Sequence, residues 1–467
     1  MADSKQFDVV VIGAGPGGYV AAIRASQHGK KVAIVEKEAL GGTCLNWGCI
    51  PTKALIHTAE TFTHLKHDHS GAITVSGLTY DWSKIIGRSR DVAGKMEKGV
   101  TALMKKNKIE TIYGTATFTE PKKLSIATLD GATTEVTAKD AIIIATGARS
   151  ATLPGVTIDG TSVISSREAM VWPTQPKSIA VIGAGAIGLE FAYFFNAFGT
   201  KVTVLEYQPK LMPAGDDDVS AQLEKSMTKA GVQSITGAAV KSVDKVSGGV
   251  KVTYEKDGKA NVVEAEVALM AIGVRPNTEN LGLEKIGVKV ERQGIVVNGF
   301  CQTSVAGVYA IGDVIGAPAL AHAASAEALI AAEHICGRKP HPINYENVPA
   351  CIYCQPQVAQ VGLTEAQVKA KGIEYRVGRF PFMVNGKSVA VGSTEGFVKI
   401  IADKKYGEIL GAHIIGHNAT EMIHELALAK AKELTIEDIH TTIHSHPTES
   451  EAILEAAGVW YGEAIHI

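Results

Sequence analysis

One structural unit occurs twice in this chain, and the glycine turns of the two copies lie 170 residues apart. Each copy has the pattern of a strand, a glycine turn, a helix and a second strand that ends at a glutamate. The ranges expected for the strand, the helix and the second strand are 7–13, 16–28 and 31–35 in the first copy, and 178–182, 189–198 and 201–205 in the second. A duplicated β-α-β unit predicts an α/β fold with two parallel-sheet domains.

The turn in each copy has the pattern G-x-G-x-x-G. Its glycines are Gly13, Gly15 and Gly18 in the first copy and Gly183, Gly185 and Gly188 in the second. The first glycine permits a tight turn, the second lets the backbone approach a pyrophosphate, and the third lets the helix pack on the strand. Glycine turns are common, but the complete strand, helix and acid pattern favours two Rossmann-like dinucleotide sites over ordinary turns.

Each second strand ends at an acid that lies 18 residues after the third glycine, Glu36 in the first copy and Glu206 in the second. A carboxylate at this place accepts a hydrogen bond from a ribose hydroxyl. It repels the 2′-phosphate of NADP, so Glu206 predicts NAD at the second site. The alternative is that Glu206 is a surface acid at the end of a strand. Two dinucleotide sites in one chain suggest two cofactors that react with each other.

Two cysteines, Cys44 and Cys49, follow the first unit directly. We interpret them as a redox-active disulfide at the place where a flavin bound to that unit would end. In an ideal helix they would lie about 140° apart around the axis, so a bridge between them requires a distorted turn. Lys53 would share the Cys49 face of a helix and stabilise a thiolate or a reduced flavin. The alternative is a pair of buried free cysteines.

The composition excludes several classes of protein. A chain of 467 residues is too long for one hydrophobic core, which predicts about three domains. The formal net charge of -2 gives no reason to expect a nucleic-acid or membrane partner. The sequence has no apolar run of transmembrane length and no signal-peptide pattern at its start. We therefore expect a cytoplasmic protein, in which a disulfide is more often catalytic than structural.

Further motifs, taken in chain order with those above, resemble one family. They are A-T-G at 145–147, A-x-G-x-x-P-N at 271–277 and Y-A-I-G-D at 309–313. Together with the glycine turns and residues 41–53, they make essentially the whole chain similar to the FAD-dependent pyridine nucleotide-disulfide oxidoreductases. The resemblance implies two Rossmann-like domains, for FAD and for NAD, plus a C-terminal α+β dimerisation domain. The implied ranges are 1–150 completed by 278–347 for FAD, 151–277 for NAD and 348–467 for dimerisation.

The resemblance also implies residue roles. Glu36 would bind the adenosine ribose of FAD, Asp313 would lie near its ribityl and pyrophosphate region, and Lys53 would lie near flavin N5, paired with Glu190. Cys49 would face the flavin and Cys44 would exchange with the substrate. The other FAD residues implied are Gly13, Gly15, Gly18, Gly42, Thr43, Ala116, Thr146, Gly147, Ala319, Leu320, Ala321 and His322. The NAD residues implied are Gly183, Gly185, Gly188, Glu190, Glu206, Val240 and Gly273.

The run H-S-H-P-T-E-S-E at 444–451 resembles the segment that carries the active-site base of this family. The resemblance implies His446 as the base and Glu451 as the acid that orients it. Thiols react as thiolates, so a base that titrates near neutrality helps, and a carboxylate holds its tautomer. The run departs from the family at Glu449, where an apolar residue is common, and this acid can raise the pKa of the base. His444 is expected to be structural, and a metal site is disfavoured because no further ligands are spaced around it.

Cys351 and Cys354 match the C-x-x-C pattern of thioredoxin-type and zinc sites. The surrounding sequence is typical of a strand, in which their Cα atoms would lie about 10 Å apart, too far for a disulfide. No second pair follows that would complete a zinc site. We expect neither role there, and we expect Cys301 and Cys336 in the core.

Within the family, the sequence favours the branch that oxidises protein-bound dihydrolipoamide with NAD. Glu206 disfavours the NADP-dependent glutathione and trypanothione reductases, and residues 459–467 lack the cysteine pair of mercuric reductase and the selenocysteine or cysteine pair of large thioredoxin reductases. The pair Cys44 and Cys49 excludes flavin transhydrogenases that lack it. This branch implies a homodimer that acts on lipoyl domains of E2 components or on H-type carriers of glycine cleavage. The alternative from another class is an assembly subunit with vestigial redox groups, which the complete set of sites disfavours.

Overall fold

The computed structural model describes residues 3–66 and 72–467 and consists of two units. Unit 1 comprises Met1–Ala54, Gly87–Ala151 and Val274–Tyr345, and unit 2 comprises Leu55–Ile86, Thr152–Gly273 and Glu346–Ile467. Each unit contains one of the two glycine-turn copies that the sequence predicts.

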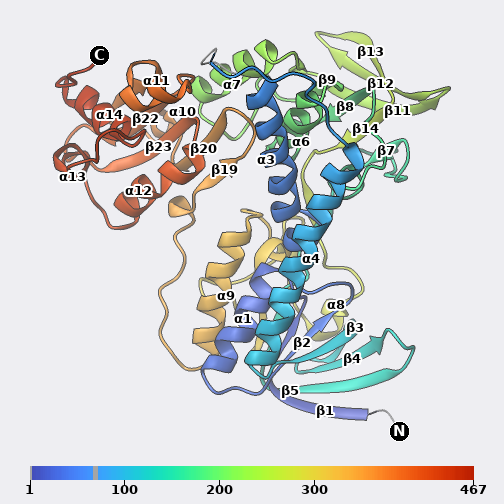
Figure 1. The fold of residues 1–467 in the computed structure, drawn as a ribbon. Coiled ribbons are helices and arrows are strands. Elements are labelled where there is room, and N and C mark those ends of the chain that lie inside the picture. The colour runs from blue at the N-terminus through green and yellow to red at the C-terminus, as the bar shows by residue number, and fades with distance from the viewer. Residues whose placement is uncertain (1–2, 67–71) are drawn as a thin grey trace. The chain divides into compact units, whose positions relative to one another are not determined.

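Unit 1 is built on a sheet whose parallel strands follow the order β3-β2-β1-β5-β18 (Figure 1). Strand β4 pairs antiparallel with both β3 and β5. The strands are β1 (Asp3–Ile12), β2 (Val32–Glu36), β3 (Glu110–Glu120), β4 (Lys123–Thr128), β5 (Thr133–Ile144) and β18 (Val308–Ala310). Every residue of β2 is buried, as expected for a parallel strand that is covered on both faces.

Helices α1 (Pro16–Gln27) and α9 (Ala321–Ile335) lie side by side against one face of this sheet (Figure 1). Ala21, Ala25 and Ala328 are fully buried in the core that the two helices share. Small side chains let two helix backbones approach closely, so these alanines allow α9 to pack beside α1. The helix that the sequence predicts over 16–28 is confirmed as α1.

Unit 2 contains a second parallel sheet in the order β10-β9-β8-β14-β7. Its strands are β7 (Val163–Ile164), β8 (Ser178–Ile182), β9 (Lys201–Leu205), β10 (Gln233–Ile235) and β14 (Val267–Met270). Strands β8 and β9 have the bounds predicted from the sequence. Helix α6 (Ala186–Ala197) begins three residues earlier than predicted, because its N-cap Gly185 is the last extended residue of the turn.

An antiparallel sheet covers one face of this parallel sheet. It consists of β11 (Ala239–Val246), β12 (Gly249–Lys256) and β13 (Lys259–Ala265). Val250 and Val252 of β12 share a hydrophobic core with Ala180 and Ile182 of β8. The opposite face packs against α6, whose phenylalanines are buried in another core.

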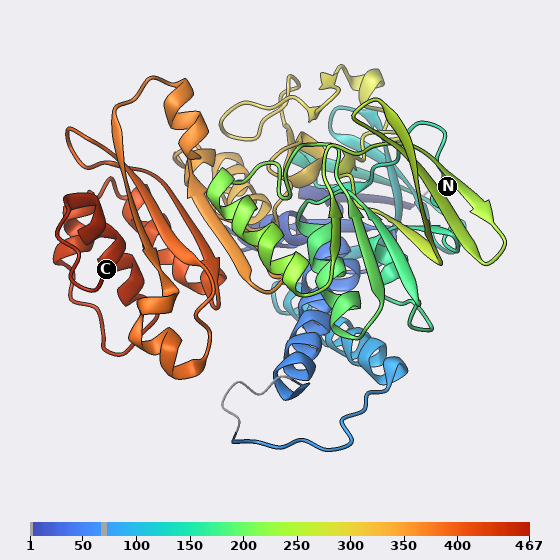
Figure 2. The same cartoon turned by 90° about the horizontal axis from the view of Figure 1, so that it is seen from above.

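The C-terminal part of unit 2 is an antiparallel sheet in the order β19-β20-β23-β22-β21, with helices beside it (Figure 2). The strands are β19 (Ala350–Ile352), β20 (Gln357–Gly362), β21 (Tyr375–Pro381), β22 (Phe397–Asp403) and β23 (Ile409–Gly416). Helix α12 (Ala419–Ala431) contacts β20 and β23, and α14 (Glu451–Tyr461) contacts β21 and β22. The succession of strands and then helices predicted from about residue 348 is confirmed.

The remaining elements are α2 (Gly42–Trp47), α3 (Cys49–Lys66), α4 (Trp82–Lys106), α5 (Ser166–Ala169), α7 (Asp217–Lys229), α8 (Leu283–Ile286), α10 (Glu365–Ala370), α11 (Gly386–Val391), α13 (Ile436–Thr441), β6 (Ala148–Ser150), β15 (Val274–Pro276), β16 (Val290–Glu291), β17 (Gly294–Ile295) and the 3-10 turns η1 (Gly312–Ile315), η2 (Tyr345–Asn347) and η3 (Phe382–Val384). Among the residues that the structure describes, no helix is both long and apolar enough to cross a membrane.

A buried lysine holds helix α7 against the C-terminal sheet. The Nζ atom of Lys399, on β22, lies 2.8 Å from Asp216, 2.8 Å from Asp218 and 2.7 Å from Glu365. Lys399 is 1% exposed and Asp216, the N-cap of α7, is 2% exposed. Removing one partner of a buried ion pair leaves the other charge uncompensated, so this contact is costly to break.

We predict that Lys399→Met lowers the free energy of unfolding of the protein by about 3–5 kcal/mol, measured by urea denaturation at pH 7. The hydrogen bond from Lys399 holds the pKa of Glu365 at about 2, below its ordinary 4.5. The stability that Glu365 contributes is present above pH 4.5 and is lost as the pH falls towards 2, so the difference between wild type and variant should shrink over that range.

The matched control is Lys404→Met, which removes an exposed lysine that lies 3.6 Å from Glu374. It should change stability by less than about 0.5 kcal/mol. A Lys399→Met variant as stable as this control would show that the buried network contributes nothing.

Candidate active site

The first glycine turn packs tightly against the strands of unit 1. Gly13 has a φ of 99°, and a Cβ atom there would collide with the carbonyl of Ala145, just after β5. A Cβ atom on Gly18 would collide with the Gly13 carbonyl, whereas one on Gly15 would meet nothing within 4 Å. Gly15 is the N-cap of α1 and supplies no side-chain cap, so the first N–H groups of the helix lack an intrahelical or side-chain partner. This open side fits a pyrophosphate.

Glu36 ends β2 beside this turn and is almost fully buried. Its Oε2 atom accepts a hydrogen bond of 2.8 Å from the Ala14 N–H, and its Oε1 atom accepts one of 2.8 Å from the Glu38 N–H. Each carboxylate oxygen retains a lone pair, so Glu36 can also accept hydrogen bonds from ribose hydroxyls.

The second turn repeats this geometry in unit 2. Gly183 has a φ of 106°, Gly188 approaches the Gly183 carbonyl, and a Cβ atom on Gly185 would meet nothing within 4 Å. Glu206 follows β9 directly and is buried, and it accepts hydrogen bonds of 2.7 Å from the Ala184 N–H and 2.8 Å from the Gln208 N–H. The duplication predicted from the sequence therefore extends to the hydrogen bonds of both acids.

Thr146 and Gly147 follow the end of β5 and are held by Asn277. The Thr146 hydroxyl donates to the Asn277 carbonyl at 2.8 Å, the Asn277 side-chain amide donates to the Thr146 carbonyl at 3.0 Å, and the Asn277 N–H donates to the Gly147 carbonyl at 2.9 Å. The A-T-G and P-N motifs, 131 residues apart, thus form one structure. Of the other implied residues, Ala116 is buried on β3, Val240 lies on β11, and Gly273 lies between β14 and β15.

Asp313 lies in the 3-10 turn η1, three residues after β18 ends at Ala310. Burial raises the pKa of Asp313. The implied stretch Ala319, Leu320, Ala321 and His322 forms the start of α9, whose N-cap Leu320 supplies no side-chain cap. Glu327, which the sequence analysis missed, accepts a hydrogen bond of 2.6 Å from the Gly312 N–H. The available signal was an acid in α9 with alanines on both sides, at 326 and 328.

Cys44 and Cys49 form a disulfide, with their Cα atoms 4.7 Å apart. The distorted turn that the sequence requires is Gly48, whose φ of -150° and ψ of -115° separate α2 from α3. The segment is joined to the first glycine turn by the Gly41 N–H, which donates to the Ala14 carbonyl at 2.8 Å. Gly42 and Thr43 open α2, and Gly42 packs on the backbone of Gly15.

Cys49 is the first residue of α3, a helix of 18 residues, and Lys53 follows one turn later on the same face. The positive end of a helix dipole and a nearby cation both stabilise a thiolate. Cys49 thus lies where the helix dipole would stabilise its thiolate, and a stabilising role of Lys53 stays a prediction. Lys53 and Glu190 belong to different units, so their expected pairing stays a prediction. The Glu190 carboxylate is buried and accepts from the Tyr353 N–H at 3.2 Å.

His446 and Glu451 are paired as the sequence analysis expected, with Nδ1 of His446 2.9 Å from Oε1 of Glu451. A carboxylate only accepts, so Nδ1 carries the proton and Nε2 is left with a lone pair. Glu451 is itself held by the Thr448 N–H, at 2.8 Å. Partial burial pushes the pKa of Glu451 up, but the hydrogen bonds from Thr448 and His446 keep it below its ordinary value. The His446 side chain is 78% exposed.

The two neighbours of the base have other partners. His444 Nε2 lies 2.8 Å from Glu425 on α12, and its Nδ1 lies 3.0 Å from the Thr442 carbonyl. Glu449, which the sequence analysis linked to the pKa of the base, is instead bonded to His417 and Asn418. The cause is the direction of the loop, which turns Glu449 into the protein and leaves His446 outside.

Within the described part of the chain, no disulfide involves Cys301, Cys336, Cys351 or Cys354. Cys301 is buried in the core, as expected, whereas Cys336 is only partly buried. Strand β19 ends at Ile352, and Cys354 is buried and donates towards the Pro356 carbonyl at 3.4 Å.

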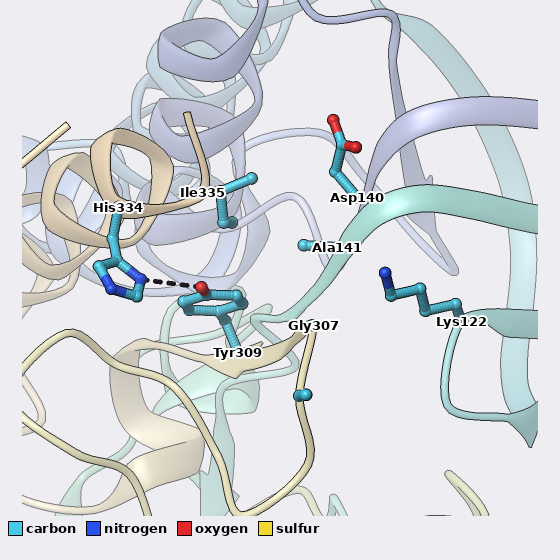
Figure 3. Close-up of a pocket in the computed structure, with 8 residues that line it drawn as sticks. Lys122, Asp140, Ala141, Gly307, Tyr309, His334 and Ile335 are labelled. Atoms are coloured by element: carbon cyan, nitrogen blue, oxygen red, sulfur yellow. Dashed lines mark hydrogen bonds between the residues drawn. The ribbon is translucent and has the colours of Figure 1, made fainter. Parts of the chain in front are cut away.

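A cavity of roughly 250 Å³ lies in unit 1, where Tyr309 and His334 are hydrogen-bonded at 2.8 Å and Lys122 and Asp140 complete the wall (Figure 3). Asp140 and Gly307 directly precede the residues through which β5 and β18 pair in parallel, so the cavity lies at the amino end of that pairing. The glycine turn lies at the carboxyl ends, and the cavity is therefore separate from the dinucleotide site.

Residues 7–328 match the family Pyridine nucleotide-disulphide oxidoreductase, and residues 348–457 match the dimerisation domain of that family. The chain is 45% identical to the dihydrolipoyl dehydrogenase of Zymomonas mobilis over all of both chains. It is 46% identical to the dihydrolipoyl dehydrogenase of Rhizobium etli, over 99% of this chain and 100% of that one. The crystal structure of LpdA from Mycobacterium tuberculosis superposes with a TM-score of 0.88 and 29% identity, over 97% of this chain and 99% of that one.

These matches confirm the predicted fold class, with FAD and NAD domains and a C-terminal dimerisation domain. FAD and NAD are the cofactors of this family, and the match to the dimerisation domain supports a homodimer. The match over the full length, at 45% identity, is far above what a shared fold alone requires. The chain belongs to the pyridine nucleotide-disulphide oxidoreductase family and, within it, to the dihydrolipoyl dehydrogenases.

Proposed function

We propose that this protein oxidises the dithiol of a protein-bound dihydrolipoyl group and reduces NAD+ to NADH, with release of one proton. The observation that carries the proposal is the Cys44–Cys49 disulfide at a helix break, joined by a backbone hydrogen bond to a dinucleotide turn. A disulfide in a ring this small suits turnover better than scaffolding. The names of the relatives support the same reaction.

We infer that FAD occupies the site around Gly13, Gly15 and Glu36, and that NAD occupies the site around Gly185 and Glu206. The domain ranges are those given from the sequence: 1–150 with 278–347 for FAD, 151–277 for NAD, and 348–467 for the subunit interface. When bound, FAD carries the electron pair from the reduced cysteines to NAD+. The glycine turns bind the pyrophosphates, and the two glutamates orient the riboses.

The thiol exchange is the part that the chain itself performs. His446 accepts the proton of one substrate thiol at Nε2, because Glu451 holds its Nδ1 proton. The thiolate attacks Cys44, the Cys44–Cys49 bond breaks, and Cys49 leaves as a thiolate stabilised by the start of α3 and by Lys53. The second substrate sulfur then displaces Cys44, so the substrate leaves as a disulfide and the enzyme holds two reduced sulfurs.

The partners follow from this activity, whereas the compartment is the one expected from the sequence. The carriers would be lipoyl domains of E2 components or H-type glycine-cleavage proteins, and the compartment would be the cytoplasm. His446 is exposed in unit 2, in the range that matches the dimerisation domain, which supports its contribution to a site shared between two subunits.

We predict that Cys44→Ser and Cys49→Ser each lower the rate of dihydrolipoamide oxidation by about a thousandfold or more. FAD should remain bound, because the glycine turn is unchanged. Cys44→Ser should show a long-wavelength charge-transfer band from the Cys49 thiolate, and Cys49→Ser should lack it. The measurements are steady-state assays and absorbance spectra.

The control is Cys336→Ser, which changes a free cysteine in the same unit. Its rate and spectrum should equal those of the wild type. A Cys44→Ser enzyme that oxidises dihydrolipoamide at the wild-type rate would contradict the proposed mechanism.

Glu206 should select the nicotinamide cofactor. Replacing it with arginine should raise the KM for NAD and improve the use of NADP, while Glu206→Gln should lower kcat/KM for NAD by roughly 10- to 150-fold through the loss of one charged hydrogen bond. The KM for dihydrolipoamide should not change in either variant. A wild type that already prefers NADP would contradict the NAD assignment.

The shared site can be tested with hybrid dimers of a Cys44→Ser chain and a His446→Gln chain. If the base acts on the disulfide of the other subunit, one of the two sites regains both wild-type groups, and about half of the wild-type rate should return. Self-sufficient subunits would leave both sites damaged. Purified hybrids that show no recovery would therefore rule out sharing.

A further inference from the structure

Three histidine–carboxylate pairs surround the segment that carries the base. We call residues 442–450, between α13 and α14, the base loop. The first pair is His446–Glu451, and the second is His444–Glu425. In the third pair, Nδ1 of His417 lies 3.1 Å from Oε1 of Glu449. Only the third pair has its carboxylate in the base loop and its histidine outside it.

Glu449 is a buried acid whose two oxygens both have donors. His417 reaches Oε1, and the Asn418 amide donates to Oε2 at 3.0 Å. The Glu449 side chain is 8% exposed and that of His417 is 30% exposed. A carboxylate this deeply buried is costly unless it is paired and hydrogen-bonded, so Glu449 depends on these two donors.

The contact of Glu449 with His417 and Asn418 connects two parts of the C-terminal region. His417 and Asn418 form the turn between β23 and α12, and Asn418 is the N-cap of α12. Glu449 lies at the start of α14, since its carbonyl accepts the Ala452 N–H at 3.0 Å. Helix α14 begins with Glu451, the acid that holds His446. The contact therefore links a turn beside the central strand β23 to the residue that orients the base.

We propose that Glu449 and His417 are positioning residues that hold the base loop so that Glu451 can orient His446. The proposal rests on the proposed function, in which His446 is the base. It also accounts for the departure of Glu449 from the apolar residue common in the family, because a buried acid requires the partners that His417 and Asn418 supply. The pair His444–Glu425 remains as a second anchor, so loss of the third pair should impair the base and not abolish it.

The contact is charge-dependent. Two carboxylates act on His417, Glu449 from the base loop and Glu60 from α3, and the hydrogen bond to Glu449 holds the pKa of His417 above its ordinary value of 6.5. A histidine whose pKa is raised by folding stabilises the folded protein fully at pH values below its pKa in the unfolded chain. This stabilisation is lost as the pH rises through its pKa in the folded protein. The contact should therefore hold the base loop most firmly below about pH 6.5 and less firmly as the pH rises above it.

The test compares His417→Leu, Glu449→Leu and the double variant as FAD-loaded dimers. His417→Leu leaves a buried carboxylate without its cation, so kcat for dihydrolipoamide oxidation should fall at least about tenfold. Glu449→Leu leaves only a partly exposed histidine without its partner, so kcat should fall less in this variant. The double variant should recover most of the kcat that is lost in His417→Leu. The KM for NAD should stay unchanged.

Two further readouts separate positioning from a general structural role. The wild-type kcat should decline on the alkaline side, and this decline should be absent in the double variant. The NMR titration of His446 should shift in His417→Leu. The matched control is His466→Leu, because His466 and Glu455 form another such pair, 2.7 Å apart, outside the base loop. This control should change neither the rate nor the titration.

Each outcome decides the proposal. If His417→Leu keeps kcat within twofold and keeps the His446 titration of the wild type, the proposal is wrong. If His417→Leu loses FAD or fails to fold, Glu449→Gln replaces it, because that variant removes the charge and keeps the shape; an unchanged alkaline decline in Glu449→Gln would then overturn the proposal. A His446→Gln enzyme with the wild-type rate would instead refute the proposed function, whatever the other variants do.

Discussion

The close backbone packing of residues 13–18 is the constraint on which unit 1 depends. Gly13 packs against the carbonyl of Ala145, which follows β5, and Gly18 packs against the carbonyl of Gly13. Neither contact leaves room for a Cβ atom on the glycine. Ala14, in the same turn, makes two further hydrogen bonds. Its carbonyl accepts from the Gly41 N–H, and its N–H donates to the Glu36 carboxylate. The dinucleotide turn, Glu36 and the cysteine segment are therefore parts of one backbone arrangement, and the disulfide is joined to the glycine turn of the first β-α-β unit.

Buried carboxylates with two donors hold most of the functional loops. Glu36 and Glu206 each bind two backbone N–H groups, Glu327 binds the Gly312 N–H and the Tyr345 hydroxyl, and Glu449 binds His417 and Asn418. All four are at most 8% exposed. An unpaired carboxylate in such places would be costly, so each of these loops has one conformation in which both oxygens are satisfied.

The proposed reaction needs negative charge to be stable at Cys49 and a proton to be accepted at His446. For the first, the structure places Cys49 at the start of α3, where the helix dipole favours a thiolate, and Lys53 follows one turn later. It provides the second through Glu451, which holds one nitrogen of the imidazole and leaves the other free. These two arrangements lie in different units, and His446 lies in the range that matches the dimerisation domain. In the proposed function, this base acts on the disulfide of another subunit.

The sequence alone determined what depends on local pattern. The spacing of glycines, helix and acid identified both β-α-β copies, because each copy is continuous in the chain and its side chains are constrained by the turn itself. The cysteine spacing likewise required a distorted turn, found at Gly48. The start of α6 was missed by three residues, since a glycine inside the motif can belong to either the turn or the helix.

Only the tertiary structure decided the partners of buried polar groups. Thr146 and Asn277 are 131 residues apart, and Glu449 and His417 are 32 apart, and no periodicity connects either pair. Strand order and the direction of loops bring them together, which is why Glu449 has His417 as its partner and not His446. A sequence shows that a buried acid needs donors, but only the packed fold determines which donors reach it.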